Sequence, residues 1–565
     1  MKNSLWCGHA VVMLTLAAVT SATRFVYAQD KPVPPRRDVD IAADSVRKEN
    51  EPSLPKIDLP EFVITGTETI NLPEFAKRRV DDSRIFDPSS DRGPGQRESL
   101  RVIVGSANKE HVAFSNLGEG FSGKVIGAYG SYSTPSFDGW FGRTSGSSDF
   151  LLKSGFKSSA GHVSNSDYRK GHASLAGGVY LSDGAGVFAG SRIRGSLGFQ
   201  GNAYRLYGSY VPNRQRTVNR FLADVVMNSD MSNLFTYNSG FYIGRTIVED
   251  SNQTSETEVG LEFAGNKDFE GFGLRGDAAY WRNFYSAPSV NGDPYFLQLG
   301  LSARYQILDK VDIVGGGVFY LVRGSDIGSV GRVYPRLSVS WYAEHWLIVF
   351  ARYEPYVQRN NLASTVEASP YVVNDVRVRH PEYFNNFSLG TELNISSSIK
   401  GKISANYERV ENLPIYVSVA LPGVWRVDYF GITRVISLQA EVYADITEND
   451  HLGATLTVRN TRNSDTDKTI PYFPGILVSG LYQHRFPFGL TLATTLQVIG
   501  KQYTDLQEQR SIATFTLLDF KAEYQIIPRL SIALMFDNVL DQKQIWWEGY
   551  EGLPRTVALR MGFMW

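Results

Sequence analysis

The last ten residues of the chain alternate between apolar positions and positions that are mostly small or polar. A strand with one apolar face suits a wall between lipid and a polar interior. Lipid offers no hydrogen bonds to an unpaired edge, so a membrane strand at the chain end must pair with another strand, which predicts a closed barrel. Taken alone, the segment also fits the edge strand of a soluble β-sandwich. The apolar face carries Val557, Leu559, Met561, Phe563 and Trp565, and the opposite face carries Thr556, Ala558, Arg560, Gly562 and Met564.

The same alternation begins near Leu100 and continues to the C-terminus. It is clearest over 451–459, 490–498, 518–524 and 530–536, where apolar residues at every second position oppose polar ones. With strands of about 9 to 11 residues, the pattern predicts roughly 20 to 23 strands. The expected fold is therefore all-β, a transmembrane antiparallel barrel of about 22 strands. Long external loops are predicted at Ser158 to Lys170, Asn360 to Glu382 and Asp541 to Leu553, opposite tight turns such as the one near Pro528.

Charged side chains that alternate with apolar neighbours are predicted to face the lumen, because a basic residue facing lipid at mid-depth costs roughly 2 to 4 kcal/mol. Pairing among them is the simplest expectation for their role. They are Arg352, Glu354, Glu392, Glu408, Arg459, Lys521, Glu523 and Arg560. Aromatic residues near strand ends are predicted to form interfacial belts, namely Trp140, Phe141, Tyr280, Trp281, Trp341, Tyr342 and Trp346.

The first hundred residues differ from the rest of the chain. Residues 1–28 combine Lys2 with a short apolar stretch and small residues before Gln29, which predicts a secretory signal peptide. Residues 29–100 are rich in proline and charge and predict a largely irregular periplasmic arm. The arm contains one apolar island that can add as a strand to another sheet, between two copies of a Leu-Pro-Glu-Phe motif. The island consists of Glu61, Phe62, Val63, Ile64, Thr65, Gly66 and Thr67.

Composition is consistent with this division, in which residues 101–565 form the barrel. The chain has 52 glycines, 30 tyrosines and 32 phenylalanines, as strands with aromatic girdles would produce. Its 57 basic and 58 acidic residues give a formal net charge of −1, which argues against a strongly basic nucleic-acid surface. The one cysteine, Cys7, lies in the predicted signal peptide, so no disulfide is expected in the mature chain.

The sequence contains no linear motif for catalysis. The eight histidines are dispersed, without the spacing of a metal site, and no nucleophile elbow, P-loop or dinucleotide fingerprint is present. We therefore expect no catalytic residue, no metal, no cofactor and no enzymatic activity. A Ser–His pair assembled across neighbouring strands would leave no linear motif and stays open.

The C-terminal segment resembles the closing segment of TonB-dependent outer-membrane receptors. Asn538 to Asp541 match the family's Asn-Leu-Phe-Asp turn, Gly549 and Tyr550 match its loop, and Pro554 and Arg555 match the entry to its last strand. The family's glycine between that proline and arginine is missing here. The island at 61–67 resembles the motif beside the TonB box or at the start of the plug. The space before the first clear strand, at 124–133, is too short for a plug domain of the usual size, so the chain resembles a receptor barrel that lacks a full plug.

This resemblance implies a protein of the bacterial outer membrane that acts as a conduit or as the membrane part of a transport assembly. The implied partners are outer-membrane lipid, the barrel assembly machinery acting on the apolar face of the last strand, and a TonB-like or other periplasmic partner acting on residues 59–75. A barrel of about 22 strands is too wide for side chains to fill, so we expect inward-folded loops, the arm or a separate protein to obstruct it. Two alternatives remain: a complete TonB-dependent receptor that imports a siderophore or an oligosaccharide, and a non-conducting structural or assembly scaffold.

Overall fold

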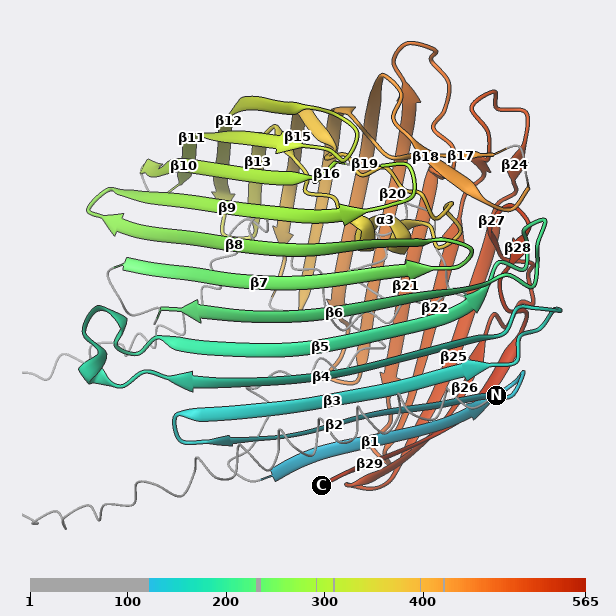
Figure 1. The fold of residues 1–565 in the computed structure, drawn as a ribbon. Helices are drawn as coiled ribbons and strands as arrows, with labels where there is room; N and C mark the ends of the chain where they lie inside the picture. Colours follow the sequence, from blue (N-terminus) through green and yellow to red (C-terminus); the bar gives the residue numbers. More distant parts are fainter. Residues whose placement is uncertain (1–120, 230–234, 291, 308–309, 397, 420–421) are drawn as a thin grey trace, which may run out of the picture. The chain divides into compact units, whose positions relative to one another are not determined.

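The computed structural model describes residues 121–229, 235–290, 292–307, 310–396, 398–419 and 422–565. The predicted signal peptide, the arm with its island at 61–67 and the first twenty residues of the predicted barrel lie outside these ranges. In the described part, one antiparallel sheet closes into a barrel because β1 pairs with both β2 and β29 (Figure 1). No described helix is long and apolar enough to cross a membrane.

The barrel wall has 22 strands, since the short β14 continues β13 along the same partner, β15. This agrees with the predicted number. The strands are β1 (Phe121–Gly130), β2 (Thr134–Ser145), β3 (Ser148–Ser159), β4 (Tyr168–Tyr180), β5 (Arg192–Arg205), β6 (Gln215–Asn228), β7 (Phe235–Glu249), β8 (Gln253–Phe269), β9 (Phe272–Ser286), β10 (Tyr295–Ile307), β11 (Val311–Arg323), β12 (Ser329–Glu344), β13 (Leu347–Tyr353) with β14 (Tyr356–Val357), β15 (Glu382–Asn394), β16 (Ile399–Glu411), β19 (Ile432–Asp445), β20 (Asp450–Asn463), β21 (Ile476–Arg485), β22 (Leu490–Ile499), β25 (Phe515–Ile527), β26 (Leu530–Asp537) and β29 (Thr556–Met564).

The connections differ at the two ends of the barrel. At one end the turns are mostly short, for example 345–346, 446–449 and 528–529, and the longest connection there contains the 3-10 helix η4 (Asp183–Phe188). At the other end lie the connections 358–381, 412–431, 464–475, 500–514 and 538–555. They contain the helix α3 (Leu362–Ala368) and the hairpins β17 (Ile415–Ser418) with β18 (Trp425–Asp428), β23 (Gln502–Tyr503) with β24 (Ser511–Ile512), and β27 (Ile545–Trp547) with β28 (Tyr550–Glu551). This is the asymmetry of an outer-membrane barrel, whose long loops face outward from the cell, and we call this end the outer mouth.

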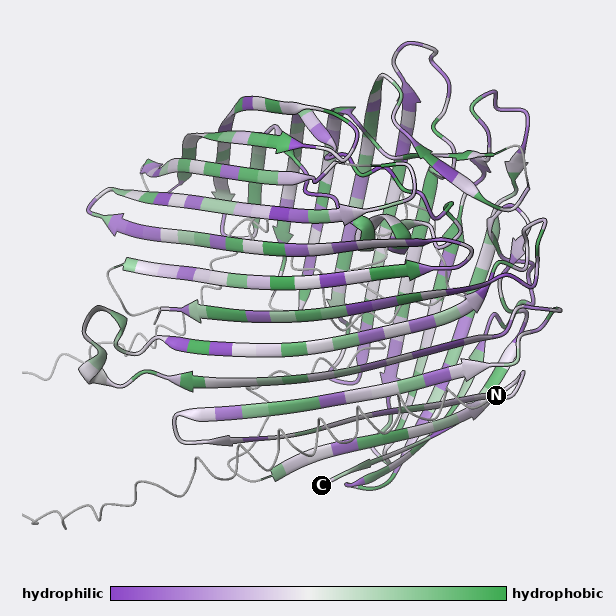
Figure 2. Ribbon diagram, viewed as in Figure 1, coloured by the Kyte–Doolittle hydropathy of each residue, from purple (hydrophilic) through white to green (hydrophobic). Residues whose placement is uncertain are grey.

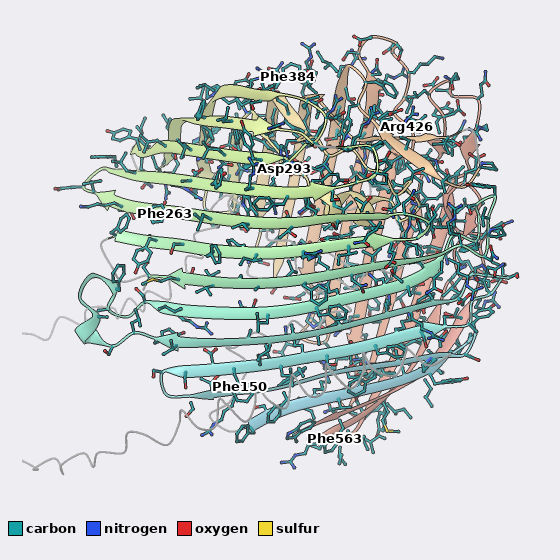
Figure 3. All side chains as sticks on the ribbon, viewed as in Figure 1. Phe150, Phe263, Asp293, Phe384, Arg426 and Phe563 are labelled. Atoms are coloured by element: carbon teal, nitrogen blue, oxygen red, sulfur yellow. The ribbon has the colours of Figure 1, made fainter. Side chains whose placement is uncertain are left out.

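The last strand closes the barrel with the predicted apolar face outward. Its apolar residues Val557, Leu559, Met561 and Phe563 are 39–55% exposed on the outer face of the isolated chain, where lipid covers them in a membrane. Figure 2 shows the alternation of apolar and polar residues along the strands, and Figure 3 labels Phe263 and Phe563 among the aromatic side chains. Trp565 extends the seam, since its amide and that of Gly123 bond to each other's carbonyl oxygens at 3.0 and 3.2 Å. A Cβ atom at residue 123 would stand 2.2 Å from the Trp565 ring, so a larger residue there would force the Trp565 side chain to move.

The predicted aromatic belts are only partly correct. Trp341 and Trp346, at the short-turn end, are 50% and 38% exposed, as expected for a belt. Trp140 and Trp281 face inward instead, because strand neighbours point to opposite faces and the adjacent Phe141 and Tyr280 take the outer face. Trp281 is buried and stacks on Tyr242 with ring centroids 5.3 Å apart. An adjacent aromatic pair in a strand therefore cannot contribute both rings to a lipid-facing belt.

Candidate functional site

The connection 358–381 is folded onto the inner side of the barrel wall. Helix α3 begins after Asn361, whose side chain accepts a hydrogen bond from the Ser364 amide while the Ser364 hydroxyl caps the Asn361 amide. This capping box stabilises a helix of two turns. Leu362, Thr365 and Val366 are buried beneath it, so the helix packs as part of a core and is not a solvated loop.

Two glutamates of β8 hold the start of this helix. Glu256 accepts hydrogen bonds from the Leu362 amide at 2.7 Å and from Asn283 of β9 at 2.7 Å. Glu258 accepts hydrogen bonds from Arg359 at 2.6 Å and Asn361 at 2.8 Å. Both side chains are almost fully buried, and the charge-assisted bond from Arg359 compensates part of the cost of burying Glu258.

The same loop places Arg359 and His380 beside these carboxylates. The Arg359 guanidinium lies 3.8 Å from the centre of the Trp281 ring, a cation–π contact. The His380 ring is buried, accepts a hydrogen bond from the Asn360 amide at 3.1 Å and packs edge-on against Phe296. Burial, together with the charge of nearby Arg359, lowers the pKa of His380 to about 4. The imidazole is therefore neutral at pH 7.

Beyond α3, the wall donates a row of hydrogen bonds to carbonyl oxygens of the loop. Arg216 of β6 reaches the carbonyls of Pro370 and Val372 at 2.6 and 2.7 Å. The hydroxyls of Tyr204 and Tyr285 reach Pro370 and Val376 at 2.8 and 2.6 Å. Backbone carbonyls that leave water need such partners, so these side chains fix the path of the loop.

An aromatic cluster joins this loop to the connections of the opposite wall. Tyr371 stacks on Tyr550, with ring centroids 3.5 Å apart. Trp425 packs against Tyr371 and Trp547 and donates its indole N–H to the Tyr472 hydroxyl at 2.9 Å. The hydrophobic core that contains these rings includes wall residues on β4, β5, β7 and β9 and also on β21, β22 and β25. The core thus bridges opposite sides of the barrel at its outer mouth.

The predicted lumen-facing charges occupy inward positions of the wall. Register places Arg352, Glu392, Glu408, Arg459, Lys521, Glu523 and Arg560 on the inner face, with Glu354 buried just after β13. One pair forms as expected, Lys521 with Glu523 at 2.5 Å, while Glu392 pairs at 3.4 Å with Lys402, which was not among the predicted residues. These ion pairs line the barrel below the loop core and do not belong to it.

Sequence reasoning did not identify the residues that hold the loop. The sequence does indicate that Glu256 and Glu258 face inward, because they occupy alternate positions and the apolar Val259 and Leu261 occupy the positions of the other face. No sequence pattern indicates the role of Arg216, Trp425 and Trp547, since that role depends on contacts between segments far apart in the chain. Among the described residues, no group of three or more histidine, cysteine or acidic side chains is arranged to hold a metal ion.

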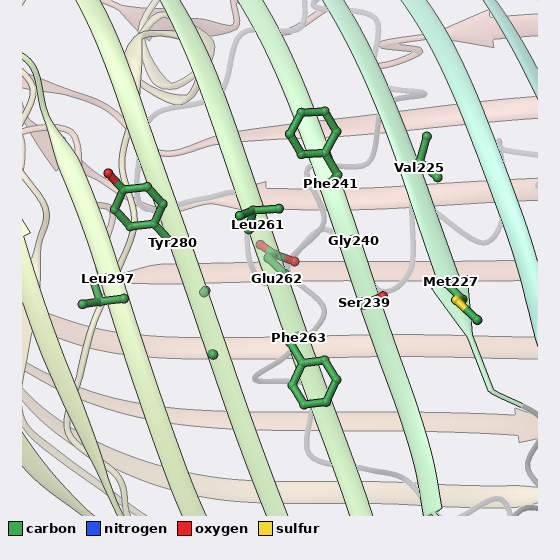
Figure 4. Close-up of a pocket in the computed structure, with 12 residues that line it drawn as sticks. Val225, Met227, Ser239, Gly240, Phe241, Leu261, Glu262, Phe263, Tyr280 and Leu297 are labelled. Carbon is green, nitrogen blue, oxygen red and sulfur yellow. The ribbon is translucent and has the colours of Figure 1, made fainter. Parts of the chain in front are cut away.

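A shallow apolar hollow of about 450 Å³ lies between β6 and β10 (Figure 4). Phe241, Leu261, Phe263 and Tyr280, which line it, are 41–53% exposed on the outer, lipid-facing side of the wall. The hollow is therefore part of the lipid-facing surface and not a pocket of the lumen.

Comparison with known proteins identifies solved structures that share the fold. No family model and no curated protein matches the chain. Solved structures do: the FrpB iron transporter from Neisseria meningitidis is 12% identical over 80% of this chain and 82% of that one, with a TM-score of 0.63. The described wall has the same barrel fold as this iron transporter.

Two further solved structures are similar to the same extent. The copper transporter OprC is 11% identical, with a TM-score of 0.63, and the siderophore receptor PiuA from Acinetobacter baumannii is 10% identical, with a TM-score of 0.62. Each comparison covers 80% of this chain and 82% of the other. At these identities the similarity establishes the architecture, a closed antiparallel β-barrel, and not the role of the residues at the mouth.

Proposed function

We propose that the chain is an outer-membrane transport protein whose wide, polar lumen is gated at the outer mouth by the loop core around Tyr371 and Trp425. The hydrophobic cluster that bridges opposite walls carries this proposal, because an open barrel of this width conducts unless something obstructs it. The solved structures with the same fold are described as transporters and receptors, which supports transport and not catalysis.

The buried polar groups beneath the loop distinguish a gate from a permanent seal. A permanent seal needs only apolar packing, whereas Glu256, Glu258 and Arg216 hold the loop through buried hydrogen bonds. Such hydrogen bonds can be replaced by hydrogen bonds to water or ligand when the loop moves, whereas exposing an apolar core to water brings no replacement contact. We therefore favour a closed conduit over a non-conducting scaffold.

Conductance of the purified full chain in planar bilayers tests the proposal. The wild type should show few steady openings, and a variant with residues 359–379 replaced by a short Gly-Ser linker should show large ones. A matched variant shortens the connection 160–167, whose residues lie outside the aromatic cluster, and should behave as the wild type. The 359–379 replacement would also be made in a chain that lacks residues 29–100. Absence of conductance in both replacement variants would instead support a non-conducting scaffold.

We further propose that the island Glu61 to Thr67 binds a TonB-like or other periplasmic partner by strand addition. Support comes from the resemblance of the island to the family motif and from its apolar, strand-forming composition. Deleting 61–67 should abolish co-purification of the partner while barrel insertion stays intact. Unchanged co-purification would contradict partner binding through the island.

A further inference from the structure

Three arginines form a ladder on the outer face of the barrel. Arg409 of β16 lies directly opposite Arg434 of β19, and Arg434 lies opposite Arg462 of β20. Their strand neighbours Val410, Thr433 and Thr461 point inward and are buried, so the arginines point outward. The side chains of Arg434 and Arg462 are 42% and 36% exposed.

The ladder has an excess of positive charge. Like charges directly opposite each other on neighbouring strands destabilise a sheet. The described contacts give these arginines one carboxylate, that of Asp467, which lies 3.2 Å from Arg434 and 3.3 Å from Arg462. Arg409 instead lies over the Phe384 ring, at 5.1 Å, and Phe384 is labelled near the top of Figure 3. An anion placed at the ladder would relieve the repulsion.

The ladder stands at the boundary of the apolar band. Ile436 and Leu438 follow Arg434 on the outer face of β19 and are 49% and 48% exposed, and Val458 on β20 is 41% exposed. Two residues along a strand correspond to about 7 Å. The guanidinium groups therefore lie just beyond the hydrocarbon region at the outer mouth, where lipid headgroups of the outer leaflet are found.

We propose that Arg409, Arg434 and Arg462 bind the phosphate groups of an outer-leaflet lipid whose acyl chains cover Ile436, Leu438 and Val458. Guanidinium groups bind phosphate oxygens in a bidentate manner, which lysine cannot reproduce. The apolar surface directly below the basic row fits a molecule that carries phosphate and hydrocarbon together. Free phosphate satisfies only the first of these two features.

Binding of lipid A, a glycolipid with two phosphates, to the purified full chain tests the proposal by native mass spectrometry. The triple variant R409Q/R434Q/R462Q should lose about 100-fold in affinity, from roughly fivefold for each arginine. The triple lysine variant keeps the charge and should lose less. The control R143Q removes an outward arginine at the other end of the barrel, where it lies over Phe121, and should bind as the wild type.

Two further arms separate the sources of affinity. Diacylglycerol, which carries acyl chains but no phosphate, should bind the wild type and the triple glutamine variant equally. Millimolar inorganic phosphate should compete only weakly with lipid A, because it lacks acyl chains. Equal lipid A binding by the wild type and the triple glutamine variant, with both folded as heat-modifiable barrels, would overturn the proposal, as would full displacement by inorganic phosphate.

Discussion

The Arg216 guanidinium and the Asp250 carboxylate form an ion pair of 2.5 Å in which both side chains are at most 2% exposed. The pair joins β6 to the turn after β7 and leaves the other side of the guanidinium free to bond the carbonyls of Pro370 and Val372. One buried arginine thus connects the wall to the loop core at the outer mouth. Since buried charges require partners, the wall and the loop stabilise each other.

Replacing Arg216 with methionine should release the loop. The change leaves Asp250 buried without its partner, and breaking a buried pair in this way costs about 3 to 5 kcal/mol. We expect faster proteolysis within 358–381 and larger steady conductance than in the wild type. The control R205Q breaks the exposed pair of Arg205 with Asp167 at the same rim and should change neither property. Unchanged proteolysis of R216M would show that the loop does not depend on this pair.

Replacing Trp425 with alanine should weaken the bridge between the two walls. Trp425 is 1% exposed and packs against Tyr371, Tyr472 and Trp547. Loss of a buried tryptophan costs about 3 to 5 kcal/mol. The near-ultraviolet circular dichroism signal of the packed aromatic rings should be lost in a thermal transition at a lower temperature than in the wild type. W341A removes a lipid-facing tryptophan that is 50% exposed and should shift this transition much less. A shift of equal size in both variants would argue against a special role for the cluster.

Acid should favour opening of the loop. The pKa of His380 is about 4 in the closed structure and about 6.5 when the ring is solvated. The closed state therefore keeps its full stability above pH 6.5 and loses it as the pH falls from 6.5 toward 4. At pH 5 the loss is roughly 1 to 2 kcal/mol. Conductance should be greater at pH 5 than at pH 7.5, and H380Q should reduce this difference. An identical pH response of H380Q would remove His380 as its origin.

The C-terminal strand should be required for assembly. Deleting residues 556–565 removes the partner of both β1 and β26 and leaves two unpaired edges, which lipid does not tolerate. G123V tests the seam more finely, because its side chain would overlap the Trp565 ring. We expect a loss of heat-modifiable barrel in both variants, measured by gel migration, while G127V, where nothing lies within 4 Å of an added Cβ, should assemble. Whether Val557 to Trp565 also form the signal for the assembly machinery stays a prediction that binding to that machinery would test.

The sequence by itself determined the wall. Strands have a period of two, so each residue's face follows from the parity of its position, and a charge facing lipid is costly. This argument placed Lys521, Glu523 and Arg560 in the lumen and made the last strand a membrane strand. It also gave the number of strands and the end that carries the long loops. The belts, predicted from positions near strand ends, were wrong for Trp140, Trp281 and Tyr342, whose parity places them on the inner face.

Only the tertiary structure decided what the loops do. Loops have no periodicity, so nothing in the sequence indicates that Tyr371 stacks on Tyr550 or that Arg216 bonds to the carbonyl of Pro370. Closing the barrel brings the connections of opposite walls to the same mouth, and the apolar side chains among them then pack together to leave water. The register of β16, β19 and β20 likewise aligned Arg409, Arg434 and Arg462, because pairing between strands is set by the whole sheet and not by any one strand.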